Sequence, residues 1–92
     1  MEKQNQNNVV NYKPVVVAKT GFSIDFSKSQ KIDSVTFNGN IIFNENKVGY
    51  VGYSGKDNKL VLNLDIESGN VAAVAPLLKS IGESIKEIAE DN

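Results

Sequence analysis

The spacing of hydrophobic residues changes once along this chain, near Glu67, and that change constrains the fold more than any other feature. From Val9 to Ile66 apolar and polar residues alternate with a period near two, which is typical of β-strands. From Val71 to Glu90 the apolar residues recur with the spacing of one side of a helix. The order predicts an α+β fold: an antiparallel sheet of about six meandering strands, twisted or partly closed, with one C-terminal helix packed on it.

The length of 92 residues allows one domain with one modest core. Residues 1–8 are polar throughout, so we expect a disordered tail there, because the segment can bury nothing to offset the entropy lost on ordering. Residues 9–92 then form a single α+β domain. No stretch approaches the about 20 apolar residues of a membrane span, and nothing near residue 1 resembles a signal peptide, so a cytoplasmic protein is the expectation.

Two segments predict the start of the sheet. Pro14 interrupts the apolar segment from Val9 to Lys19, and proline cannot donate to a β-ladder. This segment is therefore an edge strand, or a strand that begins after Pro14. The next strand has one apolar side, formed by Phe22, Ile24 and Phe26.

The sequence Asn38-Gly39-Asn40 indicates a hairpin turn, because Asn-Gly favours the tight turns that join antiparallel strands. With a two-residue loop, Ile41 and Phe43 would face away from Val35 and Phe37. With a three-residue loop, Val35 pairs with Phe43 and all four side chains lie on one side of the hairpin. We favour the second register because it buries more apolar surface.

A second hairpin is predicted from residue 48 to residue 66, after a turn at residues 44–47. Its strands are 48–53 and 60–66, with a turn at 54–59 between them. The apolar face of the last strand is formed by Leu60, Leu62, Leu64 and Ile66.

The first strand of this hairpin belongs to the glycine-rich segment VGYVGYSGK, residues 48–56. It does not fit a phosphate-binding loop. The spacing from Gly49 to Gly55 is one residue too long for that motif, and aspartate follows Lys56 where serine or threonine is required. The segment also lacks a helix directly behind it.

Two interpretations of its tyrosines stay open. In a regular strand Tyr50 and Tyr53 point to opposite faces and serve the sheet, which is the reading we favour. With a bulge at Gly52 they would share one face. Together with nearby lysines they would then form a platform for single-stranded nucleic acid, so the candidate partner-binding residues are Tyr50, Tyr53, Lys47, Lys56 and Lys59.

The residue types that are absent argue against an enzyme. The chain has no histidine and no cysteine, which removes the usual general base, the thiolate nucleophile and most transition-metal ligands. All ten basic residues are lysine, so the bidentate phosphate contacts of arginine are missing too. Asp25, Asp65 and Glu67 do not have the spacing of a calcium loop. We expect no catalytic, cofactor-binding or metal-binding residues, no bound cofactor and no membrane partner.

The helix carries an apolar stripe formed by Val74, Leu77, Leu78, Ile81, Ile85 and Ile88. Pro76 fits only a first turn, so the helix begins near Ala75 or is kinked at Pro76. The stripe is typical of a helix that packs on its own sheet. Its spacing of four and three residues is also that of a coiled-coil seam, but two heptads are too few to predict a coiled coil. Its C-terminal end is acidic, which opposes the helix dipole and hints at a basic partner, although a solvated end is the simpler explanation.

The predicted strands have apolar residues at both odd and even positions, so both faces of the sheet carry apolar side chains. One short helix cannot cover both faces. Self-association to a homo-oligomer is therefore expected. The candidate oligomer-interface residues are Val51, Ile81, Gly82 and Ile85.

These features favour a small non-enzymatic protein-interaction module, of the kind that accessory or mobile-element genes, including phage genes, encode as inhibitors or adaptors. The identity of the partner protein cannot be read from the sequence. A single-stranded nucleic-acid binder is the alternative, and a small-ligand binder inside a partly closed barrel is a third reading. The net charge of −1 provides no general attraction for nucleic acid, so nucleic acid is not the favoured partner.

Overall fold

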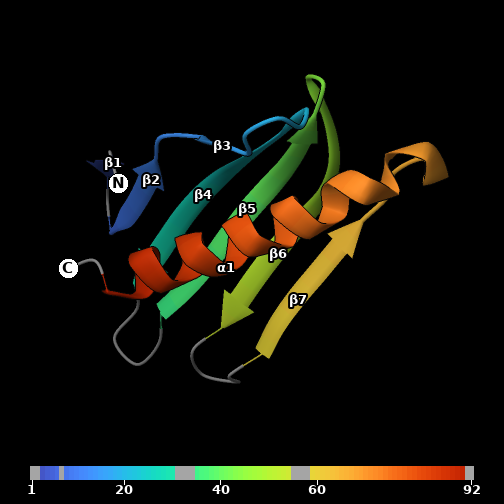
Figure 1. Cartoon of the computed structure of the whole chain (residues 1–92). Helices are drawn as coiled ribbons and strands as arrows, with labels where there is room; N and C mark the ends of the chain where they lie inside the picture. Colours follow the sequence, from blue (N-terminus) through green and yellow to red (C-terminus); the bar gives the residue numbers. More distant parts are fainter. Residues whose placement is uncertain (1–2, 7, 31–34, 55–58, 91–92) are drawn as a thin grey trace.

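The chain folds into one open antiparallel sheet with a helix across one face, as Figure 1 shows. The computed structural model describes residues 3–6, 8–30, 35–54 and 59–90. The strands are β1 (Lys3–Gln6), β2 (Val9–Tyr12), β3 (Val15–Val16), β4 (Phe22–Gln30), β5 (Val35–Phe43), β6 (Asn46–Ser54) and β7 (Lys59–Leu64). A 3₁₀ helix η1 (Ser68–Ala73) leads into the α-helix α1 (Val74–Glu90).

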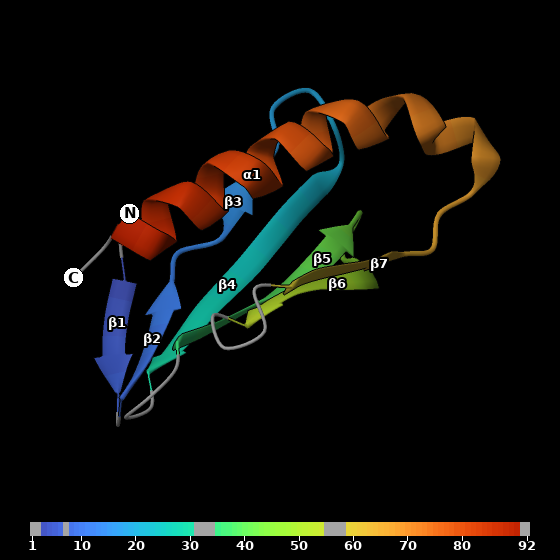
Figure 2. The same cartoon turned by 90° about the horizontal axis from the view of Figure 1, so that it is seen from below.

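The strand order is β1-β2-β4-β5-β6-β7, and the short β3 also pairs with β4. All pairs are antiparallel, as expected for strands that follow one another along the chain. Figure 2 shows the sheet on one side and α1 on the other. The predicted α+β class is confirmed, and the described residues form seven strands in an open sheet.

The segment expected to be a disordered tail contains a strand. Lys3–Gln6 form β1, which pairs with β2 from Lys3 opposite Tyr12 to Gln6 opposite Val9. Backbone hydrogen bonds hold this strand, so it needs no apolar side chains of its own. Pro14 separates β2 from β3, and both pieces run beside β4.

The predicted hairpin turn at residues 38–40 is wrong, because β5 runs unbroken through Gly39. Gly39 is buried and pairs with Phe26 on one side and Val51 on the other. A Cβ on Gly39 would lie 2.9 Å from Cγ1 of Val51 and 3.0 Å from ring atoms of Phe26. The glycine therefore makes room for its neighbours in the core and does not form a turn.

The strand pairing changes accordingly. Val35 lies opposite Gln30, and Phe43 lies opposite Phe22, with ring centroids 4.6 Å apart. Phe43 is only half-buried. Phe37 and Ile41 still face the same side, because residues separated by an even number share a face in a continuous strand. The connection between β4 and β5, residues 31–34, lies outside the described residues.

The turn expected at residues 44–47 is confirmed as a tight hairpin between β5 and β6. Asn44 and Glu45 occupy its two central positions with positive φ angles of 47° and 73°. This is the turn geometry that matches the twist of paired strands. The backbone N–H of Asn44 donates to the carbonyl of Gly21 at 3.1 Å, which ties this turn to the start of β4.

The core lies between the sheet and α1. Its helical members are Leu77, Ile81 and Ile88, so the stripe packs on the chain's own sheet as predicted, except that Leu78 is 45% exposed. Its other buried apolar members are Tyr12, Val17, Phe22, Ile24, Phe26, Phe37, Ile41 and Val51. Pro76 lies in the first turn of α1, where its missing N–H costs nothing.

A lysine of the same chain meets the C-terminal end of α1. The Nζ of Lys28, at the end of β4, donates to the carbonyl of Ile88 at 3.2 Å. A cation at this end of a helix is favourable because it opposes the negative end of the helix dipole. The contact is made to a backbone carbonyl, so the basic partner suggested by the acidic side chains of the helix end stays a prediction.

Candidate functional site at the edge strand β7

β7 is the last strand of the sheet order, and its apolar residues are left partly uncovered. Leu60, Val61 and Leu62 are 54%, 49% and 40% exposed. The residues predicted to form the apolar face of this strand differ in burial, because Leu60 and Leu62 are exposed whereas Leu64 and Ile66 are half-buried. Three consecutive exposed apolar residues on a sheet edge are unusual for a protein that stays alone in solution.

The leucines of β7 lie on the same face of the sheet as the helix. Leu60 pairs with Tyr53 and Leu62 pairs with Val51, which is 2% exposed beneath α1. Figure 1 shows α1 crossing the strands obliquely, with its N-terminal end near the C-terminal end of β7. The helix consequently leaves the first half of β7 open, and Leu60 is the most exposed of the three leucines.

The backbone of β7 also has an open side. The N–H of Asp65, directly after the strand, donates to the carbonyl of Val48 in β6 at 2.8 Å. In an antiparallel ladder the residues point their N–H and C=O groups alternately to the two sides. Asn63 and Val61 therefore face β6, and Leu60, Leu62 and Leu64 direct their backbone groups toward the open edge.

The two edges of the sheet differ in composition. The outer strand β1 has the sequence KQNQ, with polar side chains only. The outer strand β7 has the sequence KLVLNL, in which the single charged residue is the first. Natural proteins protect exposed edges with charged or polar residues. The composition of β1 suits contact with water, and that of β7 suits contact with another strand.

The structure does not bring the two candidate tyrosines together. β6 is regular from Gly49 to Ser54, so Tyr50 and Tyr53 lie on opposite faces. A register shift is present in β6, but it lies at Val48, opposite Ile41 and Ile42, and not at Gly52. A shared stacking face would require a bulge at Gly52, and β6 as described has regular pairing there.

Each tyrosine has a different environment. Tyr53 is half-buried on the helix side and stacks on Phe37, with ring centroids 5.3 Å apart and planes inclined by 16°. Tyr50 is 45% exposed on the other face. It pairs with Asn40 of β5 on one side and with Asn63 of β7 on the other, so its neighbours across the sheet are polar. Tyr53 therefore has a structural role, and Tyr50 is accessible.

The candidate lysines occupy separate places. Lys47 lies at the start of β6 and Lys59 at the start of β7, at opposite ends of this hairpin, and both are exposed. Lys56 lies outside the described residues. Lys59 is the first residue of the edge strand β7, so it is part of the candidate site described above.

The candidate interface residues divide into buried and accessible ones. Val51 and Ile81 are 2% and 3% exposed, so neither can contact a partner unless the helix separates from the sheet. Ile85 is half-buried beside Phe37 and Tyr53. Gly82 is exposed, and a Cβ placed there would have no neighbour within 4 Å.

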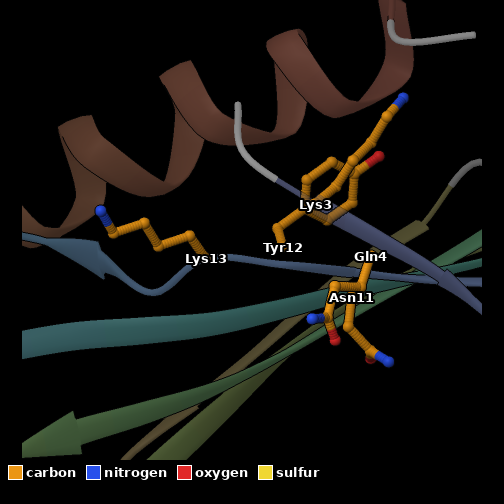
Figure 3. A pocket seen from close by; sticks show the side chains of 5 residues that line it. All are labelled: Lys3, Gln4, Asn11, Tyr12 and Lys13. Atoms are coloured by element: carbon orange, nitrogen blue, oxygen red, sulfur yellow. The ribbon is translucent and has the colours of Figure 1, made fainter.

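A shallow depression lies at the other edge of the sheet, along β1 and β2 (Figure 3). Lys3, Tyr12 and Lys13 lie on the helix side, whereas Gln4 and Asn11 project on the opposite side. These polar groups do not converge on one point, so the depression does not define a ligand site.

Three further findings bear on what this part of the protein could bind and on what the chain resembles. In the part of the chain that the structure describes, no group of three or more histidine, cysteine, aspartate or glutamate residues could hold a metal ion. Among the same residues, no helix is both long enough and apolar enough to cross a membrane. Comparison of the chain with protein families, with characterised proteins and with solved structures gave no match.

The role of β7 was missed in the sequence because its leucines show the alternation of a half-buried strand. One signal was present in the sequence. Val61 lies between Leu60 and Leu62 and points to the opposite face of the strand, so this segment is apolar on both faces. Such a run suits a strand covered on both sides. On an edge strand it leaves exposed apolar surface.

Proposed function

We propose that this chain is a small protein-interaction module without catalytic activity, which binds an extended polypeptide by adding a strand to β7. The observation that carries the proposal is the exposure of Leu60, Val61 and Leu62 on a sheet edge with outward-facing backbone groups. In strand addition the backbone hydrogen bonds supply affinity, and alternate side chains supply selectivity.

The chemistry of the edge defines the bound segment. Leu60 and Leu62 line the helix side of this edge, and both are exposed. The complementary segment is an extended strand with apolar side chains at alternate positions. An inhibitor or adaptor in the cytoplasm remains our proposal for the wider role, because binding through one edge requires no chemistry from the chain itself.

Site-specific photo-crosslinking in cells that make the protein tests this function. A photoreactive residue in place of Val61 reports on β7, and the same residue in place of Lys79, which is 80% exposed on α1, is the matched control. We expect a polypeptide to be crosslinked from position 61 and not from position 79, with the crosslinked segment identified by peptide sequencing. Equal capture from both positions, or none from position 61, would contradict the proposal.

A further inference from the structure

We propose that the strand added to β7 is β7 of a second copy of this chain, in antiparallel orientation about a two-fold axis at Leu62. The inference rests on the proposed function, since both use the open edge of β7. It goes further by naming the partner and the register. Its basis is that the sequence from Lys59 to Asp65, KLVLNLD, is complementary to itself when one copy is reversed.

Reversal about Leu62 places unlike charges opposite each other at both ends. Lys59 of one copy lies opposite Asp65 of the second copy, and the second contact is its symmetric equivalent. Both residues are exposed. They also share a face of the strand, the face away from the helix, because they are separated by an even number of residues. Opposite charges directly across a strand pair stabilise it, and like charges destabilise it.

The same register matches the apolar residues. Leu60 lies opposite Leu64 of the second copy, and Leu62 lies opposite Leu62 of the second copy, all on the helix side of the joined sheet. Because these leucines direct their backbone groups to the open edge, each pair can exchange both of its N–H···O bonds. The pairing covers the exposed surfaces of Leu60 and Leu62, which α1 leaves open.

Other arrangements fit less well. A shift of two residues in one direction places Val61 opposite Asp65, and Lys59 then lies opposite Glu67, three residues past the end of β7. A shift of two in the other direction places Lys59 opposite Asn63 and leaves Asp65 beyond the paired region. A shift of one residue sets the leucines against the polar face. Parallel pairing in register places Lys59 beside its own copy and Asp65 beside its own copy, which brings like charges together.

The geometry allows a test by charge exchange. In a homodimer of the Lys59→Asp variant, two carboxylates face each other at both ends of the strand pair. In a homodimer of the Asp65→Lys variant, two ammonium groups face each other at both ends. In a mixture of the two variants, one copy of each forms a heterodimer with unlike charges at both ends. Since these side chains are exposed on the wild-type strand, the substitutions leave the core unchanged.

Sedimentation equilibrium at low ionic strength, from micromolar to hundreds of micromolar protein, measures the outcome. We expect a wild-type dimer, a loss of affinity of roughly 10-fold or more in each single variant, and recovery in the mixture. Leu62→Lys, which places two ammonium groups at the axis, should weaken the dimer by about 100-fold or more. Lys79→Asp on the far side of α1 is the control and should leave the dimer unchanged. Circular dichroism verifies that each variant is folded.

Two results would overturn the inference. The first is a folded wild-type protein that is monomeric at hundreds of micromolar. The second is a dimer that responds to none of the substitutions at positions 59, 62 and 65. If position 61 then crosslinks a different polypeptide, the proposed function stands and the second copy is excluded as the partner. If position 61 crosslinks nothing, both proposals fail.

Discussion

The backbone carbonyl of Asn63 in β7 occupies the space that a side chain on Gly49 in β6 would need. The two residues are neighbours across the pairing of these strands, directly beside the register shift at Val48. Gly52 in the same strand is different, because a Cβ there would meet only Oδ1 of Asn38, at 3.6 Å. Gly49 and Gly52 each precede a tyrosine in the repeated GY sequence. Glycine is required at position 49, where the backbone of β7 lies too close for a side chain, and it is not required at position 52.

Gly49→Ala should therefore destabilise the fold, whereas Gly52→Ala should not. A methyl group at position 49 forces the backbones of β6 and β7 apart, at a cost of about 1–3 kcal/mol or more in the free energy of unfolding. At position 52 the substitution should change that free energy by less than about 1 kcal/mol, with alanine favoured by the lower entropy of its unfolded chain. Urea unfolding monitored by circular dichroism compares them. Equal stability of the two variants would contradict the close approach.

Gly39→Ala should be destabilising through the Phe26 ring, which lies 3.0 Å from the position of the added methyl group. We expect a loss of about 1–3 kcal/mol in the free energy of unfolding, because both Phe26 and Val51 are buried and have little room to move.

A double-mutant cycle with Phe26→Leu identifies the cause of that loss. The smaller side chain vacates part of the crowded space, so the cost of Gly39→Ala should fall by about 0.5 kcal/mol or more in the Phe26→Leu background. Independent, additive effects would show that the ring is not what the methyl group meets.

Lys28→Met should weaken the end of α1, because it removes the donor to the Ile88 carbonyl while retaining most of the side-chain volume. A charged hydrogen bond at a helix C-terminus predicts a loss of about 1–2 kcal/mol in the free energy of unfolding. Lys79→Met is the matched control. Its ion pair with Glu83 is 4.0 Å long and exposed, so its removal should cost less than about 0.5 kcal/mol. The same thermal unfolding curve for both variants would exclude a role for the Lys28 contact.

The sequence predicts the class of fold because burial follows local periodicity. The strand through Phe22, Ile24 and Phe26 and the helix stripe through Leu77, Ile81 and Ile88 were both identified in this way, and all six residues are buried. Their positions depend on which face of an element is apolar, and that face is visible in the spacing of the residues alone.

The errors arose where the outcome depends on residues far apart in the chain. Asn38-Gly39 has the local sequence of a turn, but Gly39 is needed opposite Phe26, whose ring approaches it from the neighbouring strand. The contact of Lys28 with Ile88 spans 60 residues. The exposure of Leu60 depends on the direction in which α1 crosses the sheet, and the alternation within β7 carries no information about that direction.

The two tyrosines of β6 provide the last prediction, because they were candidates for one site and have opposite surroundings. Tyr53 stacks on the buried Phe37, and its loss opens a gap beside Ile85. Tyr53→Ala should therefore cost about 2–4 kcal/mol in the free energy of unfolding, since the ring is only half-buried. Tyr50→Ala, on the polar face, should cost less than about 1 kcal/mol.

Fluorescence anisotropy with a labelled single-stranded oligonucleotide at low salt extends the comparison. A stacking platform requires both rings on one face, so Tyr50→Ala should leave any weak, salt-dependent binding through the lysines nearly unchanged. A loss of about 1–3 kcal/mol in binding free energy for Tyr50→Ala would instead show that the polar face stacks bases. In that case the single-stranded nucleic-acid reading would gain support from Tyr50 alone, because Tyr53 lies on the helix side of the sheet.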